Sequence, residues 1–191
     1  MNTKTLSRIN SLLLVGIIIV NLYLIAAPLT PMVAFWLSNH SGAKTKQLTT
    51  KIAGTIPTSV GNRLIVPSMA FDQPIFDGPD MRTLDKGVWR RPNTSMPDKG
   101  GNTVIVGHRF TYTNPRGAFY YLNKVKIGDE IGIFWQGKKY IYKVSSVSEV
   151  SPTQLSVENN TLNAELTLYT CTPLWLPKDR LVVVAQLEAQ S

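Results

Sequence analysis

The sequence predicts an all-β domain behind a single N-terminal membrane helix. After residue 62 the chain consists of short apolar runs, rich in β-branched and aromatic side chains, that turn residues separate. No window after residue 72 carries a sustained helical period of apolar residues with capping residues. Before the domain, no charged residue appears between Arg8 and Lys44. A chain of 191 residues with 43% hydrophobic content suffices for one such domain.

The first element, residues 1–37, is interpreted as a cytoplasmic tip followed by a transmembrane signal-anchor. The stretch 12–27 is almost wholly apolar, and the segment supplies the roughly 20 residues that a spanning helix needs, even if Pro28 bends it. Lys4 and Arg8 flank its near end, which favours a cytoplasmic N-terminus. We therefore expect a single-pass cell-membrane protein whose folded domain is extracytoplasmic.

A cleaved signal peptide is the alternative interpretation of this segment. The small Ala26-Ala27 pair after an apolar stretch is similar to a cleavage site. Pro28 would follow that cleavage point directly, and the apolar stretch continues past it to Leu37. These two features favour the anchor.

Residues 38–60 are predicted to form an extracytoplasmic stalk, and residues 61–191 the folded domain. The stalk is rich in Ser, Thr, Lys and Gly and has few large apolar side chains. His40 lies in it and is interpreted as a solvated polar residue. Strands are predicted at Arg63–Val66, Thr103–Val106, Glu130–Trp135, Lys139–Val150, Glu165–Cys171 and Leu181–Leu187. Gln136-Gly137 is typical of a tight hairpin turn.

The net charge of +8 raises the question of a nucleic-acid partner. Residues 1–71 hold six Lys or Arg and no acidic residue, whereas residues 72–191 hold fourteen basic residues against twelve acidic ones. The basic excess therefore lies beside the apolar segment, and the folded part is close to neutral. This distribution favours anionic membrane lipid as a partner and argues against nucleic acid.

Cys171 is the only cysteine, so an intrachain disulfide is impossible and the thiol is available to react. It ends a predicted strand in which Thr167 and Tyr169 share its face. Only eight residues separate it from Arg180, which opens the next strand. A parallel crossover takes about a dozen or more, so the two strands are predicted to be antiparallel if they pair. Cys171 and Arg180 then lie at the same edge of the sheet.

His108 also lies just past a predicted strand end. A thiol alone is mostly protonated at neutral pH, and nearby cations favour the thiolate. Histidine also suits proton transfer to a departing amine and from an incoming one. Arg180 keeps its proton and is suited to stabilising negative charge or holding a carbonyl. These residue types indicate thiol catalysis, although a lone cysteine is often a small buried hydrophobe.

Three segments together resemble the sortase family of cysteine transpeptidases. Thr167-Leu-Tyr-Thr-Cys171 is similar to the family signature Thr-Leu-x-Thr-Cys, Thr103-Val-Ile-Val-Gly-His108-Arg resembles its histidine segment, and Asp179-Arg180-Leu-Val-Val resembles its arginine strand. Asn62-Arg-Leu-Ile-Val-Pro67 looks like the strand that opens these domains, so the resemblance covers residues 62–188.

The resemblance implies a closed eight-stranded β-barrel with short helices in its loops and a groove leading to the cysteine. It implies that Cys171 attacks the Thr carbonyl of a Leu-Pro-x-Thr-Gly-like sorting motif of a surface protein while His108 protonates the leaving amine. An amine of a peptidoglycan precursor or a pilin lysine then resolves the thioacyl enzyme. Arg180 would bind the oxyanion or the substrate backbone, and Thr170 would position substrate.

Two absences favour protein anchoring over pilin polymerisation: no Asp-Pro-aromatic lid motif precedes the first strand, and no second apolar span follows at the C-terminus. No carboxylates show calcium-loop spacing, so neither a metal nor a cofactor is expected. Two other functions stay open. A thiol peptidase or amidase would release the same acyl intermediate to water, and a non-catalytic surface interaction domain would bury an inert Cys171.

Overall fold

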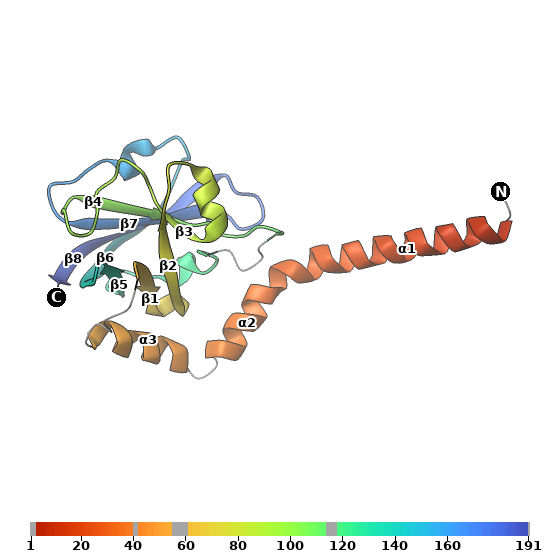
Figure 1. Ribbon diagram of the computed structural model, residues 1–191, viewed down its shortest axis with the longest axis horizontal. Helices are drawn as coiled ribbons and strands as arrows, with labels where there is room; N and C mark the ends of the chain where they lie inside the picture. The colour runs from red at the N-terminus through yellow and green to blue at the C-terminus, as the bar shows by residue number, and fades with distance from the viewer. Residues whose placement is uncertain (1–2, 40–41, 55–60, 114–117, 191) are drawn as a thin grey trace.

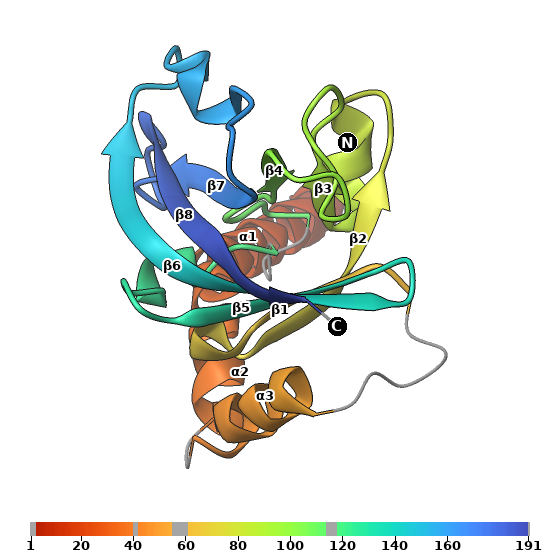
Figure 2. The same ribbon diagram turned by 90° about the vertical axis from the view of Figure 1, so that its left-hand side faces the viewer.

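The computed structural model describes residues 3–39, 42–54, 61–113 and 118–190. Its main feature is a closed barrel in the order β1-β2-β3-β4-β7-β8-β6-β5 (Figures 1 and 2). The strands are β1 Arg63–Val66, β2 Phe71–Asp77, β3 Val88–Arg90, β4 Asn102–Val106, β5 Glu130–Trp135, β6 Lys138–Val150, β7 Glu165–Thr172 and β8 Asp179–Gln190. The predicted eight-stranded barrel is confirmed.

The helices are short except at the N-terminus. They are α1 Thr3–Ala26, α2 Thr30–Asn39 and α3 Ala43–Ala53, with single 3₁₀ turns η1 Ala27–Leu29, η2 Pro67–Met69, η3 Met81–Lys86, η4 Leu122–Lys124 and η5 Leu155–Glu158. All of the helical structure described after residue 61 is therefore 3₁₀ and lies in the connections, as the absence of helical periodicity indicated.

Six strands lie where the sequence predicts them, and β2 and β3 were missed. Pro74 interrupts the pattern of β2, because proline lacks the N–H that a ladder needs. β3 has only three residues, too few for alternation to be visible. The predicted hairpin at Gln136-Gly137 is confirmed, since both residues have positive φ, 49° and 77°, as a two-residue turn of this kind requires.

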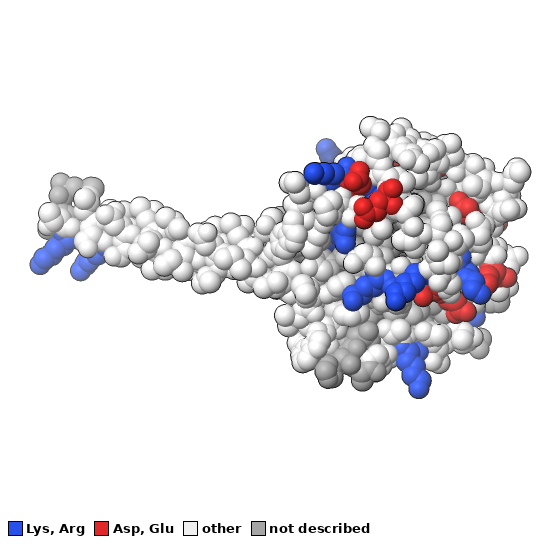
Figure 3. Space-filling view, turned by 180° about the vertical axis from the view of Figure 1, so that it is seen from behind, with Lys and Arg blue, Asp and Glu red and all other residues white. Residues whose placement is uncertain are grey.

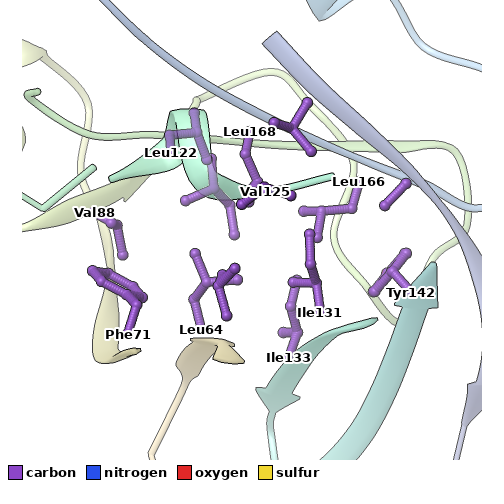
Figure 4. Packing of buried hydrophobic residues seen from close by; sticks show 14 of the residues in the cluster. Leu64, Phe71, Val88, Leu122, Val125, Ile131, Ile133, Tyr142, Leu166 and Leu168 are labelled. Atoms are coloured by element: carbon purple, nitrogen blue, oxygen red, sulfur yellow. The ribbon is translucent and has the colours of Figure 1, made fainter. Parts of the chain in front are cut away.

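The barrel interior is filled by apolar side chains from every strand and from η4 (Figure 4). Leu166 and Leu168 of β7 point into it and are fully buried. Tyr169 instead packs on the outer face, against the buried Trp89 cluster. The predicted alternation of β7 is thus confirmed, and Cys171 continues the outer face that Tyr169 occupies.

Helix α3 corrects part of the predicted stalk, because it packs on the barrel. Leu48 and Ile52, one helical turn apart, are buried against Ile65 and Phe134. Gly132 of β5 makes this close approach possible, since a Cβ there would lie 2.8 Å from the Ile52 side chain. The low apolar content of the segment concealed this two-residue face. The remainder of the predicted stalk, including His40, lies largely outside the described residues.

An ion-pair network joins α3 to the first two strands. Lys51 Nζ and Arg63 Nε donate to opposite oxygens of Asp72, each at 2.7 Å. Burial alone would raise the pKa of the Asp72 carboxyl, but the hydrogen bonds and charges of both cations hold it below its ordinary value. The helix is therefore fixed to the barrel by polar as well as apolar contacts.

The N-terminal helix projects away from the barrel (Figure 1). Within the described part of the chain, Thr3–Leu37 is the one helical segment long and apolar enough to cross a membrane. Its side is bare of charge, and the cations lie at its far tip (Figure 3). The helix changes direction at η1, where Pro28 is buried and its carbonyl accepts a 3.0 Å hydrogen bond from the Tyr120 hydroxyl.

Replacing Ile52 by Ala tests the packing of α3. The substitution leaves a cavity against β5, and we expect it to lower the free energy of unfolding by about 2–5 kcal/mol. The matched control is Gln47→Ala in the exposed face of the same helix, which should change it by less than about 0.5 kcal/mol. Denaturant unfolding of the full chain in detergent micelles measures both. Equal, small effects would show that the segment is a stalk without core contacts.

Candidate active site

The site is built at one end of β7, where its two neighbours bring different residues to Cys171. β8 runs antiparallel to β7, and the register places Arg180 directly opposite Cys171. The two side chains meet, with Arg180 Nη1 3.4 Å from Cys171 Sγ. The antiparallel pairing inferred from the short connection is confirmed, as is the shared edge.

The other neighbour, β4, runs parallel to β7 and brings His108 to the same end. Val106 pairs with Tyr169, and Gly107 N donates to Tyr169 O at 3.4 Å. Continuing this register by two residues sets His108 level with Cys171, on the outer face that Val106 and Tyr169 share. The sulfur, the imidazole and the guanidinium thus come from three adjacent strand ends.

Cys171 and His108 are both accessible, as a reaction with an external molecule requires. Cys171 is half-buried. The His108 side chain is 38% exposed, and its Nε2 lies 4.0 Å from Oδ1 of the well-exposed Asp85. A surface contact of this length contributes little energy, and the backbone of His108 is held as well, since its carbonyl accepts a 3.0 Å hydrogen bond from Phe119 N.

Thr170 contacts the backbone directly before His108. Its side chain is only 2% exposed, and its hydroxyl donates a 2.7 Å hydrogen bond to the carbonyl of Gly107, the residue before His108. The hydroxyl therefore ties the nucleophile's strand to the histidine's strand. Because this hydroxyl is buried and already bonded to the backbone, a direct contact with substrate stays a prediction.

A cavity of about 660 Å³ opens beside the histidine. It lies between β2, η3 and the segment after β4, and it is lined by Phe71, Gln73, Leu84, Asp85, Lys86, Gly87, His108, Thr111, Thr113 and Ala118. Cys171 and Arg180 are not among its lining residues. Of the three predicted catalytic residues, only His108 lines this cavity.

Arg109 is a second guanidinium near the sulfur that sequence reasoning missed. Its Nη1 donates a 2.8 Å hydrogen bond to Thr172 Oγ1, and Thr172 in turn donates to Glu149 at 3.3 Å. Burial lowers the pKa of Arg109, although the nearby charges of Glu149, Tyr120 and Cys171 oppose that shift. Its position directly after His108 was the only signal in the sequence.

A polar network on the outer face fixes the connection that precedes β7. Glu158 of η5 accepts hydrogen bonds from Arg91 Nε at 3.0 Å and from the Tyr169 hydroxyl. Burial and the Glu158 carboxylate together raise the pKa of Tyr169, so its hydroxyl stays protonated as a donor. The connection is therefore held two residues before Cys171. Nothing in the sequence linked Glu158 to the site.

Within the described ranges no three His, Cys, Asp or Glu side chains form a group that could hold a metal ion. The chemistry available to these residues is that of a thiolate nucleophile beside an imidazole acid–base and a fixed positive charge.

The chain is similar to several known proteins. It is 34% identical to sortase E1 of Streptomyces coelicolor over 136 residues, 63% of this chain and 38% of that protein. It is 29% identical to sortase A of Listeria monocytogenes over 130 residues, 68% of this chain and 57% of that protein. The matched region thus spans 38–57% of the length of these two curated relatives.

Solved structures agree with these relatives. The Listeria monocytogenes sortase A structure matches 69% of this chain and 89% of its own, with a TM-score of 0.62 and 29% identity. The structure of Streptomyces coelicolor sortase E1 with a tripeptide in the active site matches 72% and 93%, with a TM-score of 0.60 and 29% identity.

The sortase domain family model matches residues 64–188, which include all eight strands except the first residue of β1 and the last two of β8. Cys171, His108 and Arg180 all lie inside the matched region. The chain belongs to the sortase family.

Proposed function

We propose that this chain is a membrane-anchored cysteine transpeptidase that joins surface proteins bearing a sorting motif to an amine acceptor. The observation that carries the proposal is the contact between Arg180 and Cys171 across β7 and β8, with the strand of His108 on the other side. Membership of the sortase family supports it, as does the tripeptide held in the active site of the related sortase E1.

The first half-reaction transfers the acyl group to sulfur. Cys171 Sγ attacks the threonine carbonyl carbon of a Leu-Pro-x-Thr-Gly-like motif, and negative charge develops on the carbonyl oxygen. Arg180 stabilises that charge, since its guanidinium already lies beside the sulfur. The amide C–N bond then breaks, and the imidazolium of His108 gives its proton to the departing amine.

The second half-reaction restores the free enzyme, with Cys171 as thiolate and His108 as imidazolium. The amine of a peptidoglycan precursor, or a pilin lysine, attacks the thioester carbon and loses a proton to His108. The C–S bond breaks and a new amide forms. One amide is thus exchanged for another, and His108 and Cys171 return to their starting protonation.

The anchor gives the reaction its location. In this proposal residues 1–37 are the cytoplasmic tip and membrane span, with Lys4 and Arg8 on the cytoplasmic side. Residues 38–60 form a linker whose helix α3 rests on the barrel, and residues 61–191 are the extracytoplasmic catalytic domain. Anionic lipid next to the span is the expected membrane partner.

Product analysis tests the proposed reaction. The full chain in detergent micelles is incubated with a sorting-motif peptide, with and without an added amine. We expect an amine-dependent ligated product and a thioacyl adduct on Cys171, both visible by mass spectrometry, and neither with Cys171→Ala. Hydrolysed peptide alone, at a rate that the amine does not alter, would identify a thiol peptidase instead. An unreactive Cys171 would contradict enzyme function.

Replacing Thr170 by Val tests whether its hydroxyl positions His108. Valine keeps the shape but loses the hydrogen bond to Gly107, and we expect kcat to fall roughly tenfold to a hundredfold because a small misplacement of a catalytic group is costly. KM should change little.

The control for this experiment is Thr167→Val in the same strand, where the lost hydrogen bond joins Asn102, away from the site. Both variants should lose similar stability, about 1 kcal/mol. Loss of kcat in both, in proportion to stability, would show that Thr170 is only structural.

A further inference from the structure

An aromatic cluster that the proposed reaction does not use lies next to the site. Its members are Phe110, Tyr112, Trp175 and Leu176, here called the aromatic rim. Phe110 packs on both rings, with centroids 5.1 Å from Tyr112 and 6.1 Å from Trp175. Trp175 and Leu176 are 62% and 66% exposed. Exposing this much clustered apolar side-chain surface to water is unfavourable in free energy.

One member of the aromatic rim, Tyr112, contacts the membrane helix. The Tyr23 hydroxyl of α1 donates a hydrogen bond to the carbonyl of Tyr112. The nearby Tyr120 hydroxyl donates to the carbonyl of Pro28, where α1 has just ended. In Figure 1 the loops after β4 and after β7 lie on the side of the barrel from which α1 leaves.

The length of α1 indicates the depth of these contacts relative to the bilayer. A helix rises about 1.5 Å per residue, so Arg8 and Ala27 lie about 28 Å apart along it, close to the roughly 30 Å hydrocarbon thickness of a bilayer. With Arg8 at the cytoplasmic boundary, Ala27 reaches the opposite one. Tyr23 then lies about 6 Å inside that boundary, and its contact with Tyr112 places the aromatic rim at or just below the boundary.

The rim side chains suit that environment. Tryptophan and tyrosine are enriched where headgroups meet acyl chains, because their rings are apolar and their N–H or O–H is polar. A lysine lies in the same loop as two of them, since Lys178 is exposed three residues after Trp175. Such cations are attracted to anionic headgroups.

We propose that the aromatic rim inserts into the outer interfacial layer of the bilayer, so that the catalytic site opens at the membrane surface. The inference rests on the proposed span by α1. Phe110 is two residues from His108 and Trp175 four from Cys171, so the loops that carry the rim directly follow these two catalytic groups. The site is thereby held at the height of substrates that are themselves tethered to the membrane.

The experiment measures the depth of Trp175 by fluorescence quenching with brominated lipid. The full chain carrying Cys171→Ala, so that no reaction occurs, is placed in vesicles of phosphatidylglycerol and phosphatidylcholine, the latter brominated either near the headgroup end or near the far end of its acyl chains. Trp36→Phe removes the other exposed tryptophan, and the remaining two, Trp89 and Trp135, are 1% and 2% exposed. Trp175→Phe gives the background of these two.

Two controls calibrate the depth in the background without Trp36 and Trp175. Ile18→Trp places an indole in the exposed side of α1, near the middle of the span, and should be quenched by lipid brominated near the far end of its acyl chains. Leu162→Trp places one before the start of β7, whose residues from Glu165 to Cys171 span about 20 Å, and should not be quenched.

We expect Trp175 to lose emission and to shift to the blue, most strongly with bromine near the headgroup. If bromine leaves Trp175 emission unaltered while Ile18→Trp is quenched, the aromatic rim does not insert into the bilayer. The anchor and the transpeptidase proposal would both stand. If neither indole is quenched, α1 does not span the bilayer and the inference falls with it. Catalysis is measured separately, so its failure would not affect this result.

Discussion

The position of β7 between a parallel and an antiparallel neighbour is the constraint on which the site depends. The antiparallel register with β8 brings Arg180 to Cys171, and the parallel register with β4 brings His108 to the same end. A slip of one residue in either ladder would move a catalytic group to the opposite face of the sheet. Closure of the barrel prevents such a slip, because each strand is paired on both sides and fills the same interior.

The side chains of β7 hold the strand in place on both of its faces. Leu166 and Leu168 fix the strand to the core, whereas Tyr169 fixes the outer face through Glu158 and Arg91. Thr170 adds a hydrogen bond to the histidine strand. Cys171, the last residue but one of β7, therefore follows residues that are held on both faces, and it is itself half-buried and accessible. Rigid support around a reachable sulfur is what covalent catalysis requires.

Much of this arrangement could be predicted from the sequence, because local patterns carry it. Alternation gave the faces of β7, and the short connection after Cys171 gave its antiparallel partner. The parallel pairing of β4 with β7 joins segments about sixty residues apart, and no local pattern contains it. The resemblance to sortases supplied barrel closure, whereas the parallel pairing was not predicted.

The features that were missed fall into two groups. Some show no recognisable local pattern, and others depend on contacts between segments that are distant in the sequence. β2 contains Pro74 and β3 is only three residues long, so neither shows a strand pattern. α3 presents just Leu48 and Ile52 to the barrel, in a segment whose composition otherwise indicates a linker. The contacts of Arg109 and Glu158 exist only after the barrel has closed, and their charges look like ordinary surface charges in the sequence.

The reactivity of Cys171 toward a neutral haloacetamide at neutral pH tests most directly whether Arg180 acts on the sulfur. The thiolate is the species that is alkylated, and the charged hydrogen bond from Arg180 favours it over the thiol. Arg180→Gln removes that hydrogen bond and should therefore slow alkylation roughly tenfold. Lys178→Gln, which removes an exposed cation two residues away, should leave the rate nearly unchanged. Equal rates in the wild type and both variants, with the fold intact, would contradict the proposed role of the β7–β8 register.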